Sequence, residues 1–68
     1  MRKQTKLTNR QIEILSKLEK GKYYKEIGEE LGITTGTVKQ HIHQIFLKLG
    51  ASNRTEAVIN WRNFEQES

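Results

Sequence analysis

The sequence contains no cysteine, no proline and no aspartate. Because there is no cysteine, disulfide bonds and zinc sites built from thiolates are both excluded, and packing or association must stabilise the fold. The absence of aspartate excludes a phospho-aspartyl switch within this chain. No apolar run approaches the roughly 20 residues that a membrane-spanning helix needs, and the N-terminus lacks the apolar core of a signal peptide. We therefore expect a cytoplasmic protein that has no membrane partner.

The chain is also short, and few of its residues are suited to catalysis. Its 68 residues make one small domain. A domain of this size removes only about 60% of its unfolded surface from water, which leaves little room for a buried active site. The sequence also lacks the glycine-rich loop that holds phosphates in nucleotide-binding enzymes. We predict that the protein is not an enzyme and that it needs no cofactor.

The formal charge is +4, and the positive residues are clustered. No acidic residue lies between Glu30 and Glu56, although this segment carries Lys39, Lys48 and Arg54. A second basic cluster lies near the N-terminus and consists of Arg2, Lys3, Lys6 and Arg10. A solvated basic surface is the commoner explanation of any one such cluster, but clustering of this kind is also typical of proteins that bind a polyanion.

Capping residues and glycines predict four helices. Thr8 is a good N-cap, and Gln11 three residues later completes a capping box. Thr34 caps the third helix, and Gly50 ends it. The expected helices begin after Thr8, at Tyr23 or Tyr24, after Thr34 and at Asn53, and they end at Gly21, Leu31, Leu49 and about Asn63. We therefore predict an all-α domain at residues 7–63, between a basic arm at residues 1–6 and a frayed acidic tail at residues 64–68.

The spacing of apolar residues assigns an inward face to the helices. The expected inward residues are Ile12, Ile14, Leu15 and Leu18 in the first helix, with Leu7 packed on Ile12, then Val38, Ile42, Ile45 and Leu49 in the third, and Ala57, Val58 and Trp61 in the fourth. The outward side of the third helix carries Gly36, Gln40, His43, Gln44 and Leu47, with Lys39 on its flank. The outward side of the fourth carries Thr55, Ile59 and Arg62.

The second and third helices are joined by the short segment LGIT, which is the pattern of a helix-turn-helix. The third helix has a polar outward side without acids. A helix with its side chains is about 10 to 12 Å across, and the major groove of B-DNA is about 12 Å wide. The outward side of the third helix can therefore reach base edges.

His41 and His43 suggest a metal site at first sight, but their spacing argues against one. Residues two apart on a helix point about 200° from each other, so the two rings cannot hold one ion from a regular helix. His41 lies beside the apolar stripe, and we expect it to be partly buried and to position the helix by hydrogen bonding. His43 faces outward, either as a solvated residue or as a contact to a ligand.

Several ordered motifs resemble the LuxR/GerE/FixJ-type DNA-binding domain. The chain has LTNRQ at residues 7–11, GKYYKEIG at 21–28, ITTGTVKQH at 33–41, KLG at 48–50 and NRTEA at 53–57. These segments are similar to the family's motifs in both order and spacing, and they cover nearly the whole chain. Gln11 stands where the family has glutamate, Tyr23 replaces a serine and Gly28 replaces an alanine. Gly28 should cost about 1 kcal/mol of helix propensity.

The resemblance implies a bacterial transcription factor with four helices that binds double-stranded DNA as a homodimer. It implies contacts from Lys39, Gln40 and His43 to bases, and from Thr34, Thr37, Lys25 and Lys48 to phosphates. The fourth helix would form the dimer interface through Thr55, Ile59 and Arg62. RNA polymerase is a further candidate partner, and the bacterial nucleoid is the expected location.

Two questions stay open at the level of sequence. One alternative function is a protein-binding module, either a fragment like region four of a sigma factor or an anti-activator that uses the dimer face. The other question concerns the length of the natural protein, because most relatives carry a sensor domain ahead of this one. The chain would be a stand-alone GerE-like regulator if it is complete, and one domain of a larger regulator if it is not.

Overall fold

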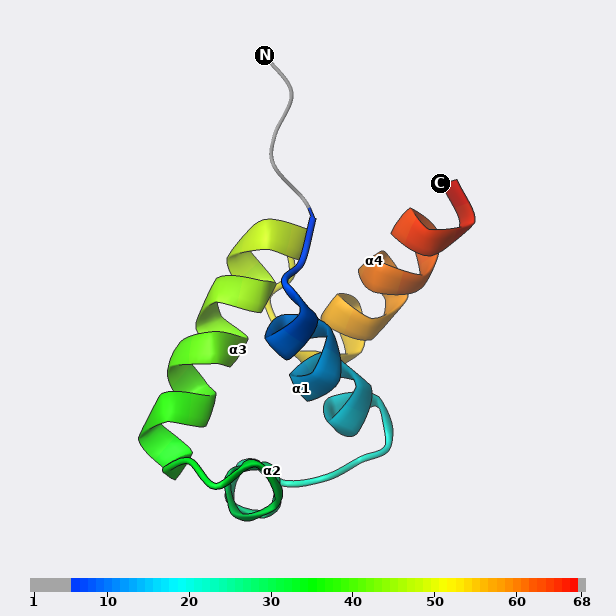
Figure 1. Ribbon diagram of the computed structural model, residues 1–68. Helices are drawn as coiled ribbons and strands as arrows, with labels where there is room; N and C mark the ends of the chain where they lie inside the picture. Colours follow the sequence, from blue (N-terminus) through cyan, green and yellow to red (C-terminus); the bar gives the residue numbers. More distant parts are fainter. Residues whose placement is uncertain (1–5, 68) are drawn as a thin grey trace.

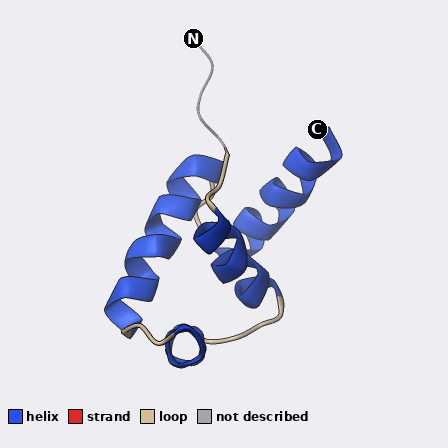
Figure 2. Ribbon diagram, viewed as in Figure 1, coloured by secondary structure: helices blue, strands red, loops and turns tan. Residues whose placement is uncertain are grey.

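The computed structural model describes residues 6–67, with side chains for residues 6–64, and consists of four helices joined by short loops (Figures 1 and 2). The helices are α1 (Asn9–Glu19), α2 (Tyr24–Leu31), α3 (Thr35–Leu49) and α4 (Arg54–Glu67). The described residues contain no strand, as the sequence predicted. Residues 1–5 of the expected basic arm and Ser68 lie outside the described residues. None of the helices within residues 6–67 is long and apolar enough to cross a membrane.

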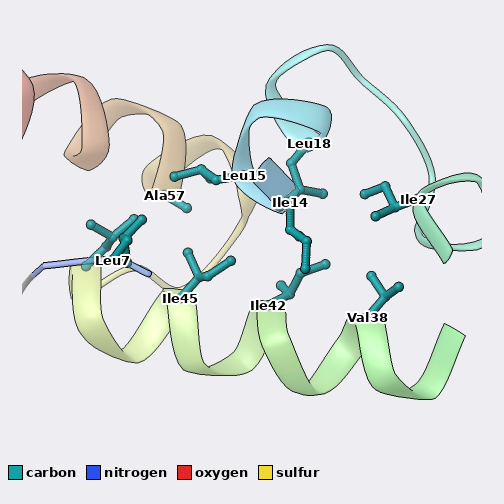
Figure 3. Close-up of a cluster of buried hydrophobic side chains, with 10 residues drawn as sticks. Leu7, Ile14, Leu15, Leu18, Ile27, Val38, Ile42, Ile45 and Ala57 are labelled. Carbon is teal, nitrogen blue, oxygen red and sulfur yellow. The ribbon is translucent and has the colours of Figure 1, made fainter. Parts of the chain in front are cut away.

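The core lies where the four helices meet. Figure 3 shows Val38, Ile42 and Ile45 projecting from α3 toward side chains of the other helices. The predicted stripe of α3 is confirmed, since all four of its members are buried. The buried apolar side chains are Leu7, Ile14, Leu15, Leu18, Ile27, Val38, Ile42, Ile45, Leu49 and Ala57. The inward face of α3 is thus fixed, and its opposite side is left at the surface.

The first turn of α1 confirms the predicted capping box. The Thr8 hydroxyl accepts a hydrogen bond from the Gln11 amide N–H at 3.1 Å, and Gln11 Oε1 accepts one from the Thr8 N–H at 3.0 Å. The prediction for Ile12 is wrong, because this side chain is 37% exposed. Ile12 is two residues before the buried Ile14, so it points about 200° away from it around the helix. Leu7 packs within the core instead.

The start of α2 is capped without the serine or threonine that such positions prefer. The Tyr23 N–H donates to Glu26 Oε1 at 2.8 Å. The carboxylate three residues later thus accepts a hydrogen bond from a backbone N–H at the start of the helix. The helix ends at Gly32, whose φ of 72° is in the left-handed region that favours glycine. An added Cβ at the buried Gly28 would lie 2.6 Å from the Ile33 carbonyl oxygen. Glycine at this position therefore lets the α2–α3 turn pack directly against α2, and this close packing offsets the expected loss of helix propensity.

An ion-pair cluster links α1 and the following loop to α2. Lys17 Nζ lies 2.7 Å from Glu30 Oε1, and Lys22 Nζ lies 2.9 Å from Glu30 Oε2. The hydrogen bond from Lys17 and then that from Lys22 lower the pKa of the Glu30 carboxyl to about 2. Glu30 therefore stays charged at neutral pH. Arg54, at the start of α4, adds a hydrogen bond from Nη2 to the Lys22 carbonyl at 3.2 Å.

The last helix is longer than the sequence predicted. Asn53 caps it as expected, because Asn53 Oδ1 accepts from the Glu56 N–H at 2.9 Å. Glu56 Oε1 in turn accepts from the N–H of Ser52 at 2.7 Å, whereas in a regular capping box it would accept from the N–H of the cap residue Asn53. The helix passes Asn63 and ends at Glu67, so most of the predicted tail is helical. Phe64 is half-buried against the core, and this packing carries the helix beyond the predicted end.

Candidate nucleic-acid interface

The N-terminus of α3 is capped from within and leaves two amide groups at its tip. Thr34 Oγ1 accepts from the Thr37 N–H at 3.1 Å, and the two threonine hydroxyl oxygens are 3.0 Å apart. Within residues 6–67, the N–H groups of Thr35 and Gly36 have no hydrogen-bond partner. Amide groups at a helix start, together with the helix dipole, favour a negatively charged group such as phosphate. The predicted phosphate contacts at Thr34 and Thr37 thus lie beside a suitable anion site.

The three predicted base contacts lie together on the outward side of α3. Lys39, Gln40 and His43 are all exposed, and within the described part of the chain none of their side chains makes a hydrogen bond or an ion pair. They line one open hollow, which His41 and Gln44 also border. No acidic residue lies on α3, so the hollow borders a helix surface whose charge is positive.

His41 lies between this hollow and the core. Its side chain is half-buried, as predicted. The hydrogen bond that we expected it to make is not present among the described residues. His41 therefore borders the site by packing alone, with its ring on the flank of the buried stripe.

The two lysines that were predicted to contact phosphates differ in their surroundings. Lys25 is exposed on α2 and has no partner among residues 6–64. Lys48 is half-buried, and its Nζ donates to Gln11 Oε1 at 3.0 Å and to the Lys6 carbonyl at 3.2 Å. Gln11 Oε1 thus accepts both the Thr8 N–H and the Lys48 ammonium. These bonds attach the end of α3 to the start of α1, and they favour a positioning role for Lys48.

We predict that Lys48→Met lowers the free energy of unfolding by about 1 to 2 kcal/mol, because two hydrogen bonds from a charged donor are lost. Urea unfolding followed by circular dichroism measures this change. Lys25→Met is the matched control and should leave stability unchanged. If Lys48 binds phosphate instead, its replacement will reduce the slope of log affinity against log salt by about 0.9.

The predicted dimer residues share the outward side of α4. Thr55, Ile59 and Arg62 are exposed, and Ile59 exposes 51% of its surface. Arg62 also contacts α1, because its Nε donates to Glu19 Oε2 at 3.0 Å and its Nη2 pairs with the same oxygen. Sequence reasoning missed this ion pair, because the partners are 43 residues apart. Glu19 thereby joins α1 to one edge of the α4 surface.

Comparison with known proteins gives consistent results along most of the chain. Residues 5–60 match the family described as bacterial regulatory proteins, luxR family. Over 53 residues the chain is 55% identical to the transcriptional regulatory protein LiaR of Bacillus subtilis, covering 78% of this chain and 25% of that protein. Over 57 residues it is 46% identical to the CsgBAC operon transcriptional regulatory protein of Escherichia coli, covering 84% of this chain and 26% of that protein.

A solved structure shows the same fold. The crystal structure of the response regulator ChrA, from a heme-sensing two-component system, aligns with a TM-score of 0.85 and 40% identity, covering 88% of this chain and 30% of that one. The chain spans about a quarter of the length of the curated relatives it matches. The predicted all-α helix-turn-helix fold is confirmed. The chain belongs to the luxR family of bacterial regulatory proteins.

Proposed function

We propose that this chain is a sequence-specific DNA-binding transcriptional regulator that places α3 in the major groove as a homodimer. The observation that carries the proposal is the outward side of α3, where Lys39, Gln40 and His43 are exposed on a helix that has no acidic residue. The relatives in Bacillus subtilis and Escherichia coli are named transcriptional regulators, which supports the same class of activity. Such a protein acts at the bacterial nucleoid, with RNA polymerase as a candidate partner.

The chemistry of the exposed side chains suits DNA at each position. Lys39 can donate to a guanine or to a phosphate, and Gln40 has the donor and acceptor that match adenine. His43 can donate an imidazole N–H to a base or to a phosphate. Around them, the hydroxyl groups of Thr34 and Thr37 and the ammonium of Lys25 supply contacts to the phosphate backbone. The four buried residues of α3 fix the direction in which Lys39, Gln40 and His43 project from the core.

Selection of bound DNA from a random pool, followed by a salt titration on the enriched sequence, tests the proposal. We expect enrichment of two half-sites whose centres are about one helical turn apart. The logarithm of the affinity should fall linearly with the logarithm of the salt concentration, since phosphate contacts release counterions. If no sequence is enriched and the affinity does not depend on salt, the chain is not a sequence-specific DNA-binding protein.

We predict that Ile59→Glu removes cooperative binding to a two-half-site operator and leaves binding to a single half-site unchanged. The reason is that Ile59 lies at the centre of a small exposed surface on α4, where a charge would be buried by a partner subunit. Titration of duplexes with one and two half-sites measures both affinities. Ile12→Glu is a matched control, because Ile12 is the exposed isoleucine of α1. Equal cooperativity in the two variants would contradict a dimer through α4.

The exposed Ile59 also favours a second function, namely binding another protein through the same α4 surface. An anti-activator would pair this surface with that of a relative, and a sigma-region-four-like module would bind RNA polymerase. Such a protein would tolerate replacement of Lys39, Gln40 and His43 together by alanine. In the same variant, a DNA-binding regulator would no longer bind the DNA sequence that the unaltered chain selects. One measurement of affinity for that DNA therefore distinguishes the two functions.

A further inference from the structure

We propose that Gln44 is a second adenine-contacting residue, acting one helical turn after Gln40. This inference rests on the proposed function and adds a determinant of sequence specificity to it. Gln44 borders the same hollow as Lys39, Gln40 and His43. Its side chain is exposed, and it has no hydrogen-bond partner among residues 6–64. The carboxamide is therefore available to a ligand that occupies the hollow.

Two other polar residues near Gln44 on α3 already have partners within the protein. Thr37 precedes it by seven residues and contacts the Thr34 hydroxyl at 3.0 Å. Lys48 follows it by four residues and donates to Gln11 and to the Lys6 carbonyl. These polar groups are held by the protein itself, whereas the amide of Gln44 is not. Gln44 thus extends the proposed DNA-facing surface by one residue beyond His43, into the C-terminal half of the helix.

The chemistry of a carboxamide favours adenine over phosphate. Phosphate uses only the N–H donors of the amide, whereas adenine uses both its donor and its acceptor, through N7 and the N6 amino group. Gln40 carries the same group four residues earlier, so the two amides lie on adjacent turns of one helix side. Four residues advance the helix by about 6 Å, and base pairs are stacked about 3.4 Å apart. The two glutamines should therefore contact adenines one or two base pairs apart.

The test uses the half-site enriched from a random pool by the unaltered chain. Dissociation constants are then measured for duplexes that carry each of the four bases at each half-site position, with the unaltered chain, Gln44→Ala, Gln40→Ala and Ser16→Ala. Two positions should favour adenine by about tenfold or more. Gln44→Ala should abolish the preference at one position only, and Gln40→Ala at the other. Ser16, an exposed residue of α1, is the control and should change neither.

A second variant distinguishes base contact from a general effect on the helix. Gln44→Glu keeps the acceptor and loses the donor, so the preferred base at its position should change from adenine to cytosine, whose N4 amino group donates. If Gln44→Ala weakens binding to every duplex equally, Gln44 contacts phosphate and the inference is wrong. It is equally wrong if Gln44→Ala leaves every dissociation constant unchanged. If the unaltered chain enriches no sequence, the proposed function fails first and the inference fails with it.

Discussion

Replacement of Lys39 by glutamate should lower the affinity of this chain for its operator by about 100-fold at physiological salt. Lys39 is exposed on α3 and has no partner among the described residues, so the change should act on DNA binding and leave the fold intact. Two effects add. The cationic donor is lost, and a carboxylate is placed next to the hollow in which we expect the DNA, where it is repelled by phosphates. Fluorescence anisotropy with the selected operator measures the affinity.

The control for this prediction separates a local contact from a change in total charge. Lys20→Glu alters the net charge by the same amount at an exposed position directly after α1. It should weaken binding only slightly, and less as salt increases, because distant charges are screened over about 8 to 10 Å. Equal losses in the two variants would mean that affinity follows net charge and not the surface of α3. An unchanged affinity in Lys39→Glu would favour the protein-binding alternative.

The features predicted correctly from the sequence are those set by residues close together in the chain. The capping box joins Thr8 to Gln11 within one turn, and Thr34 caps α3 by accepting from the Thr37 N–H. The buried stripe of α3 follows from the 3.6-residue period alone. The same period places Gln40 and His43 on the exposed side. Local rules therefore account for the four helices and for the exposed surface of α3 that we propose binds DNA.

The features missed from the sequence depend on contacts between distant residues. Lys48 and Gln11 are 37 residues apart, and only the packing of α1 on α3 turns a surface lysine into a donor to the α1 capping box. Phe64 extends α4 because its ring reaches the core, which no capping residue indicates. Glycine is needed at position 28 because the Ile33 carbonyl oxygen, placed there by the α2–α3 turn, leaves no room for a Cβ. Contacts of this kind decide which basic side chains have no partner among residues 6–64.

Replacement of Ile45 by alanine should remove about 2 to 5 kcal/mol of stability, the usual range for truncating a buried aliphatic side chain. Ile45 is completely buried on α3 and points into the core beneath α1 (Figure 3). A domain of this length is stable by only roughly 3 to 10 kcal/mol in total. The variant should therefore be partly or largely unfolded near physiological temperature. Thermal and urea unfolding, followed by circular dichroism, measure the loss.

Leu47→Ala is the matched control, since Leu47 lies two residues away on the same helix and exposes 58% of its surface. It should change stability by less than about 0.5 kcal/mol, as exposed positions usually do. A ligand that binds only the folded state shifts the equilibrium by mass action, so operator DNA should restore helix content to Ile45→Ala at concentrations well above its dissociation constant. Restoration by the operator, and not by an unrelated duplex at the same salt concentration, would tie the core packing of α3 directly to its role in binding DNA.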